Sequence, residues 1–267
     1  MYAKLRAEWV KSVSNGNPCQ LVSPWIVPGA LIPVRKRGPK DINMWWTVFE
    51  PSPGWSQDEK FSDHQSASNP ALAAFNGGLV CAHRGGKDDE LWYTVYNPES
   101  GWSADTKFGG GMRSGDGPAL AVYDGKLHLV HRAKHGNDYN MWHATYTTAT
   151  GWGSDNKFRE NNSLEGPALA VYGGELYCIH RGWGGNDQSL WWTKLRTGQA
   201  WTGSQRLPNH LSSAGPAAVV FRDKNGIGAD QLLVVHRGHG GLPAGAATAD
   251  EEERIAAEYA AATADIP

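Results

Sequence analysis

The side chains best suited to chemistry recur together in a short polar motif that ends on tryptophan. One clear copy, HRGGKDDELW, runs from His83 to Trp92, and further copies start at His131 and His180. Arginine donates a rigid fork of hydrogen bonds, carboxylates accept them, and tryptophan offers a flat apolar face with one indole donor. A sugar, with hydroxyl groups around its edge and C–H groups on one face, matches this combination.

The candidate ligand-binding residues are the polar and aromatic positions of every copy. The first copy departs from the pattern at Lys36 and Ile42, and the last copy, HRGHGG, never reaches its tryptophan. At best three full sites are therefore expected. The candidate residues are His83, Arg84, Asp88, Asp89, Trp92, His131, Arg132, Asn137, Asp138, Trp142, His180, Arg181, Asn186, Asp187, Trp191, Arg37, Trp45, His236 and Arg237.

A purely structural role is the competing interpretation of the same residues. In the alternating segment LHLVHR, His131 lies on the face of Leu127 and Leu129, whereas Arg132 lies on the opposite face. Each His, Arg or Asp could therefore bridge to a neighbouring unit of the fold. A packing role between units is also expected for the outer tryptophans Trp55, Trp102, Trp152 and Trp201.

The elements that must position these residues follow from the spacing of the motif. Its arginine falls at Arg37, Arg84, Arg132 and Arg181, in steps of 47, 48 and 49 residues. Each unit contains four predicted strands, which in the third copy are residues 118–123, 127–131, 141–146 and 151–158. A four-stranded unit of this length is typical of one blade of a β-propeller.

The ends of the chain determine the predicted number of blades. The last copy stops after its second strand, and YAKLRAEW near the N-terminus resembles WTKLRTGQAW, which starts at Trp192. Residues 1–15 are therefore predicted to complete the blade that residues 212–238 begin, which removes an open sheet edge. The fold class is thus all-β, a five-bladed propeller over residues 1–240 with a closing blade shared between both ends. Residues 241–267 form a C-terminal tail, predicted to be partly helical from the cap at Thr248 or Asp250.

Bulk composition excludes several classes of protein. The formal net charge of −2 over 267 residues does not indicate a nucleic-acid binder. No run of 18 apolar residues predicts a membrane-spanning helix. The opening MYAKLRAEWV lacks the apolar core of a signal peptide, so a cytoplasmic location is the default, with non-classical export as the alternative. No feature predicts the oligomeric state.

The three cysteines predict free thiols. Cys81 and Cys178 occupy equivalent positions in non-neighbouring blades, which places them beyond disulfide reach, and Cys19 has no evident partner. Free thiols fit a reducing compartment.

The topology of a blade brings the motif copies to one rim. The loop between the second and third strands shares this rim with the crossover from blade to blade, such as Phe108 to Pro118 and Phe158 to Pro167. Long polar loops on a rigid scaffold commonly bind ligands. Several equivalent sites on one rim would add avidity for a multivalent glycan surface.

The stretches GPALAVYDGKLHLVHR, LWW and GWS resemble the blades of sugar-binding β-propeller lectins of the Photorhabdus type, over roughly residues 20 to 238. The five-blade count is also that of tachylectin-2. The resemblance implies a lectin that binds simple sugars at clefts between blades, with glycans or glycoconjugates as partners.

Two alternatives to a lectin remain open. One is a propeller enzyme, such as a lyase, cyclase or hydrolase, with a single site at the central entrance. The other is a protein-interaction scaffold. No G-x-S-x-G, H-E-x-x-H or P-loop motif is present, and no recurring ligand spacing predicts a metal or another cofactor. Residues found in one blade only are the candidates for a single catalytic site: His64, His135, His143, His210, Trp183 and Arg113.

Overall fold

The computed structural model describes residues 34–36, 41–50, 52–134, 138–184, 187–221 and 230–239. Their regular structure is β-strand, apart from the 3-10 turn η1 (Gly109–Gly111). The all-β class is therefore confirmed. Residues 1–15, predicted to complete the last blade, and the predicted tail 241–267 lie outside the described residues. Among the described residues, no helix has the length and apolar character needed to cross a membrane.

The described strands form five antiparallel sheets, taken here in chain order. The first sheet contains β1 (Val34–Lys36), β2 (Asn43–Trp46) and β3 (Glu59–Gln65). The second contains β4 (Ala71–Phe75), β5 (Gly78–Arg84), β6 (Leu91–Asn97), β7 (Gly101–Trp102) and β8 (Thr106–Lys107). The third contains β9 (Ala119–Tyr123), β10 (Lys126–Arg132), β11 (Asn140–Thr147), β12 (Gly151–Trp152) and β13 (Asn156–Asn162). The fourth contains β14 (Ala168–Tyr172), β15 (Glu175–Arg181), β16 (Ser189–Leu195) and β17 (Gln205–Leu211), and the fifth contains β18 (Ala217–Phe221) and β19 (Gln231–Val235).

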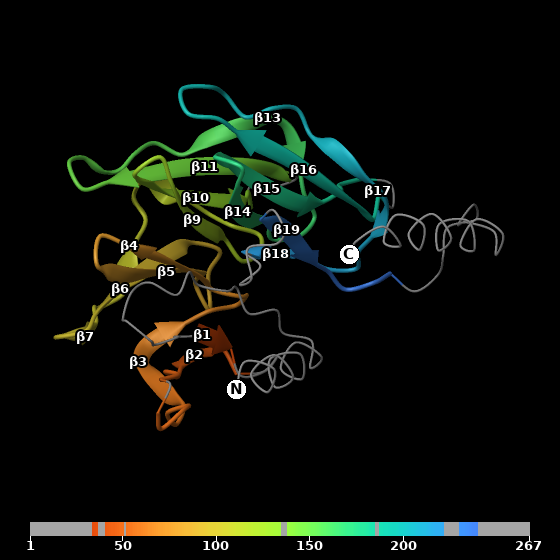
Figure 1. Ribbon diagram of the computed structural model, residues 1–267. Helices are drawn as coiled ribbons and strands as arrows, with labels where there is room; N and C mark the ends of the chain where they lie inside the picture. The colour runs from red at the N-terminus through yellow and green to blue at the C-terminus, as the bar shows by residue number, and fades with distance from the viewer. Residues whose placement is uncertain are drawn as a thin grey trace, which may run out of the picture.

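The sheets are arranged as blades around a common centre. The first strands of the second to fifth sheets contact one another in turn. Strand β4 contacts β9, β9 contacts β14, and β14 contacts β18. The outer strands β3, β7, β13 and β17 lie at the periphery (Figure 1). This arrangement is the predicted β-propeller, and five described sheets are consistent with five blades.

The second and third sheets each have an outer strand in two pieces, and in the third sheet the break releases one side chain. The predicted outer strand 151–158 is two pieces, β12 and β13, which both pair with β11. Between these pieces, Asp155 leaves the ladder and its carboxylate accepts a hydrogen bond from His131 Nε2 at 2.9 Å. Pairing resumes at Asn156, opposite His143, and the register shifts farther along β13, between the Trp142–Lys157 and Asn140–Asn162 pairs. The single continuous strand expected from the sequence was therefore wrong at this point.

Aromatic pairs join successive blades, as expected for the outer tryptophans. Trp102 packs on Phe61 of the preceding sheet at 4.8 Å between ring centroids, and Trp152 packs on Phe108 at 4.7 Å. In the same way, Trp201 stacks on Phe158 at 4.5 Å. The packing role is confirmed for these three tryptophans. Trp55 differs, because it is 44% exposed and contacts Phe49 of its own sheet.

The crossovers between blades pack backbone against backbone. A Cβ built on Gly166 would lie 2.5 Å from the carbonyl oxygen of Gly117, and one on Gly215 would lie 2.6 Å from that of Gly166. A Cβ on Gly117 would likewise lie 2.4 Å from the carbonyl oxygen of Asn69. Glycine is required at these positions because a side chain cannot fit between the two crossovers.

A buried serine shapes each described crossover. Ser66, Ser114, Ser163 and Ser212 are fully buried, and each Oγ donates a hydrogen bond to the carbonyl oxygen two residues later at 2.5–2.8 Å. The buried hydroxyl thus satisfies a backbone acceptor inside the turn. This recurring serine was not among the sequence-based candidates.

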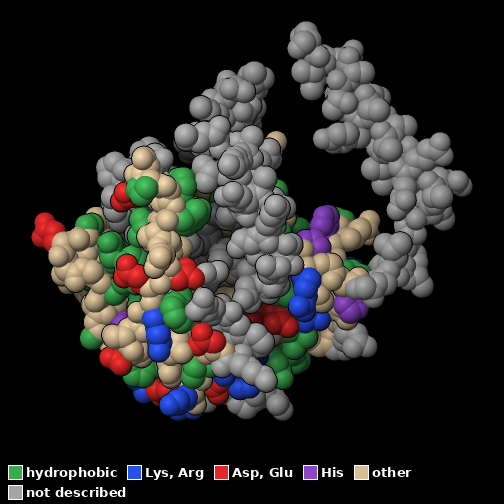
Figure 2. Space-filling model, turned by 90° about the horizontal axis from the view of Figure 1, so that it is seen from below, with side chains coloured by type: hydrophobic (Ala, Val, Ile, Leu, Met, Phe, Trp, Pro, Cys, Tyr) green, Lys and Arg blue, Asp and Glu red, His purple; other side chains and the backbone are tan. Residues whose placement is uncertain are grey.

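Charged side chains of both signs are interspersed on the face of the molecule drawn in Figure 2. Within the second and fourth sheets, Cys81 and Cys178 are buried free thiols. Burial raises the pKa of the Cys178 thiol. The third cysteine, Cys19, lies outside the described residues.

Substitution of Gly166 by alanine is expected to lower the free energy of unfolding by about 1–3 kcal/mol, because the new Cβ forces two crossovers apart. Gly203→Ala is the matched control, since no atom lies within 4 Å of a Cβ there. Urea unfolding of both variants measures the difference. Equal stability of the two variants would contradict the close packing of the crossovers.

Candidate functional site

The histidines of the repeated motif are buried and hydrogen-bonded. His83, His131 and His180 are 0%, 1% and 2% exposed. Their Nε2 atoms lie 2.9 Å from Asp105, Asp155 and Ser204, which follow the outer tryptophan of the same blade. Each imidazole therefore ties the second strand of a blade to its outer edge. The structure supports a structural role for these rings, and contact of any of them with a ligand stays a prediction.

The first aspartate of each motif copy holds the turn before the tryptophan, and in two copies it also holds the indole. Asp41, Asp88, Asp138 and Asp187 each accept a hydrogen bond from the backbone N–H two residues on, at 2.9–3.1 Å. The indole N–H of Trp45 donates to Asp41 at 3.1 Å, and that of Trp191 donates to Asp187 at 2.9 Å. The carboxylates thus fix both the turn and the orientation of the rings.

The pKa of Asp138 shows the balance of forces at one such turn. Burial opposes its ionisation, but two hydrogen bonds from Asn140 and the charge of Lys157 together hold the pKa below its ordinary value. Asp138 is therefore an ionised acceptor at neutral pH.

The arginines of the motif point away from the histidines, as strand alternation predicts. Arg84 forms an ion pair with Asp89, and Arg181 Nη1 lies 3.1 Å from Glu165 Oε1. Arg132 is 9% exposed, and its Cζ lies 5.4 Å from the centroid of the Tyr139 ring. The histidine and arginine of one copy therefore do not meet in a common site.

The remaining candidates are scattered. Arg37, Asn137 and Asn186 lie outside the described residues. Arg237 is exposed and donates hydrogen bonds to Ser213, and His236 is half-buried beside His210 at 6.0 Å between ring centroids.

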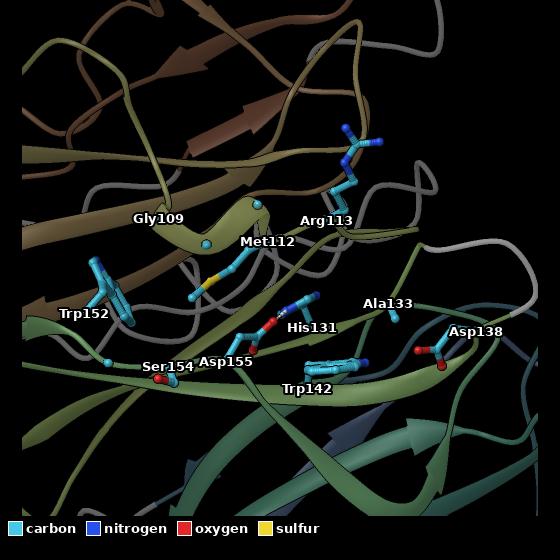
Figure 3. A pocket seen from close by; sticks show the side chains of 13 residues that line it. Gly109, Met112, Arg113, His131, Ala133, Asp138, Trp142, Trp152, Ser154 and Asp155 are labelled. Atoms are coloured by element: carbon cyan, nitrogen blue, oxygen red, sulfur yellow. Dashed lines mark hydrogen bonds and ion pairs between the residues drawn. The ribbon is translucent and has the colours of Figure 1, made fainter.

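A cleft of about 560 Å³ opens between the second and third sheets. Three of the candidates from the third motif copy, His131, Asp138 and Trp142, line it. The ring of Trp142 lies flat along one wall, across from the turn that runs from Gly109 to Met112 (Figure 3). The structure thus brings part of one predicted site together on this rim.

Residues that the motif did not include complete this cleft. They are Gly109, Gly110, Gly111, Met112, Arg113, Ala133, Trp152, Gly153, Ser154 and Asp155. Arg113 had been singled out only because it occurs in one blade. For the other cleft residues, the sequence feature that could have indicated them is the run of three glycines in one crossover. The other crossovers have no such run.

This run of glycines leaves open a space that is filled in the neighbouring gaps. Between the first and second sheets, His64 is 5% exposed and its Nε2 lies 3.1 Å from the carbonyl oxygen of Ser103. Between the third and fourth sheets, Asn161 is 1% exposed and bonded to Ser204. Met112 holds the corresponding position beside the cleft, in a crossover one residue longer.

A second cleft of about 560 Å³ lies between the third and fourth sheets and contains a chain of hydrogen-bonded rings. Trp201 Nε1 donates to His143 Nδ1 at 3.2 Å, and His143 Nε2 donates to His128 Nδ1 at 2.9 Å. His128 Nε2 then reaches the carbonyl oxygen of Tyr123 at 3.2 Å. The pattern requires both imidazoles to be neutral. Burial, followed by the neighbouring His128, lowers the pKa of His143 to about 3.

No protein-family model matches the sequence, and no curated protein is significantly similar to it. Solved structures do resemble the fold. An arginine-to-alanine triple mutant of AofleA from Arthrobotrys oligospora superposes with a TM-score of 0.60 at 11% identity, over 83% of this chain and 65% of that one. The chain therefore spans less than two thirds of the length of AofleA.

Two further structures are glycoside hydrolases. The GH93 α-L-arabinofuranosidase of Fusarium graminearum, in complex with arabinobiose, has a TM-score of 0.53 at 14% identity, over 81% of this chain and 72% of that one. A family 117 glycoside hydrolase of Zobellia galactanivorans has a TM-score of 0.50 at 13% identity, over 76% and 71%. At these identities the similarity shows the propeller fold alone.

Acid is expected to destabilise the protein through its buried neutral histidines. The pKa of His143 falls to about 3 and that of His180 to about 4, from an ordinary value of 6.5. Below pH 6.5 only the unfolded chain takes up these protons, so each ring should lower the free energy of unfolding by about 1.4 kcal/mol per pH unit. This loss continues until the folded pKa is reached.

Urea unfolding between pH 7 and pH 4 measures this slope. His143→Gln should reduce the slope of unfolding free energy against pH by the contribution of about one proton. The glutamine amide keeps one donor and one acceptor for the hydrogen bonds to Trp201 and His128. His210→Gln is the control, because His210 is exposed. An unchanged slope in the His143 variant would refute neutral burial of that ring.

Proposed function

We propose that this protein binds carbohydrate, and that the cleft between the second and third sheets is its ligand site. The observation that carries the proposal is the position of Trp142 along the wall of a cleft of about 560 Å³. An indole face in such a place stacks on the C–H face of a sugar. Clefts of several hundred Å³ are typical small-ligand sites.

Polar groups around Trp142 supply the second half of sugar recognition. Arg113 is exposed at the mouth and forms an ion pair with Glu90, with 3.5 Å between Nη2 and Oε1, so the other donors of its fork can reach a ligand. Ser154 is exposed in the cleft, and the three glycines of η1 leave backbone groups uncovered by side chains. Such donors and acceptors match the hydroxyl groups at the edge of a sugar ring.

The similar structures support a carbohydrate ligand at the level of the fold. The arabinofuranosidase was solved with arabinobiose, and the Zobellia protein is a glycoside hydrolase. Neither likeness determines the sugar that this chain binds. Glycans or glycoconjugates are therefore the proposed partners.

The cleft favours binding over cleavage of a sugar. A glycosidase uses one carboxylic acid with a raised pKa beside a second carboxylate. Here the pKa of Asp138 is lowered, because hydrogen bonds and Lys157 outweigh the effect of burial. Asp155 is already bonded to His131. Neither carboxyl group is arranged as a general acid.

We propose one open site beside the described motif loops, in place of the three that the motif copies suggested; the second cleft is lined instead by the turns at Asp124 and Gly198. His64 and Asn161 occupy the corresponding space in the neighbouring gaps. The open cleft depends on the extra residue and the missing side chains of the glycine crossover.

Trp142→Ala is expected to reduce glycan binding at least tenfold, because it removes the stacking surface. Trp92→Ala is the matched control in the gap that His64 fills, and it should bind within twofold of the wild type. A glycan array identifies the terminal sugar, and titration with that monosaccharide measures each affinity. Thermal melts of both variants establish that they are folded.

Three results would contradict this proposal. Equal loss in both variants would indicate several equivalent sites, as the repeated motif alone suggested. Release of reducing sugar from the glycans that bind on the array would indicate a propeller enzyme. A blank array together with monosaccharide-resistant binding of a protein would indicate an interaction scaffold.

A further inference from the structure

The three motif arginines that end a described strand, Arg84, Arg132 and Arg181, have different partners although they occupy equivalent positions. Arg84 pairs with Asp89 and Arg181 pairs with Glu165. Among the described residues, Arg132 forms no ion pair with a carboxylate, and its Nε, like that of Arg84 and Arg181, is buried without a hydrogen-bond partner. Arg132 is nevertheless just over nine-tenths buried.

The guanidinium of Arg132 lies beside the crossover into the third sheet. A Cβ built on Gly115 would lie 2.1 Å from its Nη2. The ring of Tyr139 lies 5.4 Å from its Cζ. A ring face stabilises a cation but accepts no strong hydrogen bond, so Tyr139 does not satisfy the donors of the fork.

A buried guanidinium without an acceptor is costly. Removing a charge from water costs several kcal/mol unless a counter-charge and hydrogen bonds replace the lost hydration. An anion that enters beside Arg132 would supply both. A planar carboxylate fits the fork of an arginine with two parallel hydrogen bonds.

The surroundings of Arg132 add the other features of a sugar site. Trp183, which is 44% exposed, lies 5.5 Å from Tyr139 between ring centroids. The carboxyl groups of Asp116 and Glu165 are in hydrogen-bond contact near the same arginine. Aromatic faces and carboxyl oxygens together suit a sugar ring and its hydroxyl groups.

We propose that Arg132 anchors a second ligand site, separate from the Trp142 cleft, which takes the carboxylate of an acidic sugar. Its described residues are Arg132, Tyr139, Trp183, Asp116 and Glu165. The site lies where the third and fourth sheets meet near the crossovers. It goes beyond the proposed function, since its ligand must be an anion.

The two carboxyl groups do not exclude an anionic ligand. Asp116 accepts hydrogen bonds from the backbone N–H groups of Gly117 at 2.7 Å and Gly166 at 2.8 Å. Burial, and then the proximity of Asp116, raise the pKa of Glu165. Arg181 adds a second positive charge. The negative charge near Arg132 is therefore partly neutralised before a ligand arrives.

Isothermal titration of the full chain with sodium D-glucuronate at pH 7 tests the site. D-glucuronamide, which has the same shape without the charge, should bind at least tenfold more weakly. Arg132→Gln should weaken glucuronate binding at least tenfold. Arg84→Gln is the matched control, because that arginine already has a carboxylate partner, and it should bind within twofold of the wild type.

The Trp142→Ala variant separates this proposal from the proposed function. It should bind glucuronate as the wild type does. The two proposals can therefore be refuted separately: loss of neutral-sugar binding tests the Trp142 cleft, and loss of glucuronate binding tests the Arg132 site. Equal binding of glucuronate and glucuronamide would overturn the proposal. Unchanged affinity in Arg132→Gln would do the same.

A second variant serves if Arg132→Gln does not fold. Gly115→Ala places a methyl group against the end of the flexible Arg132 side chain and must displace the guanidinium. Because only that side chain has to move, the fold should survive. Glucuronate affinity should then fall at least fivefold, and an affinity equal to that of the wild type would refute the anchor.

Discussion

The packing of each crossover between two sheets is the constraint on which the rest of the structure depends. The crossover backbones approach so closely that Gly117, Gly166 and Gly215 cannot carry a side chain. The first strands of the blades are thereby held at a short separation around the centre. The other residues of each crossover then lie in the gap between two blades. Their side chains determine whether that gap is filled.

This constraint explains how similar blades acquire different surfaces. His64 and Asn161 occupy two gaps with buried polar side chains that find partners there. The Gly109–Gly111 turn brings no side chain, and the cleft beside Trp142 stays open. The ligand-binding potential of the molecule therefore depends less on the repeated motif than on the crossover that faces it.

The repeated motif pairs several of its buried polar groups. The motif histidines tie each second strand to the outer edge of its blade, and the aspartates hold the turns. Among the described motif arginines that lie in strands, Arg132 differs in having no ion pair, and burial of a charge without a counter-charge is unfavourable unless a ligand supplies one. The two proposed sites thus have different physical origins, one from missing side chains and one from a missing partner.

Sequence periodicity alone determined the all-β class and the boundaries of many strands. The predicted strands 118–123, 127–131 and 141–146 correspond to β9, β10 and β11, because alternation and turn residues are local signals. It also indicated that His131 and Arg132 lie on opposite faces. The site was predicted only in part: His131, Asp138 and Trp142 do line one cleft, whereas Arg132 lies elsewhere. Only the tertiary structure decided which motif loop faces an open cleft and which arginine lacks an ion pair. Both depend on side chains from another blade or a distant crossover, whose contacts no local pattern encodes.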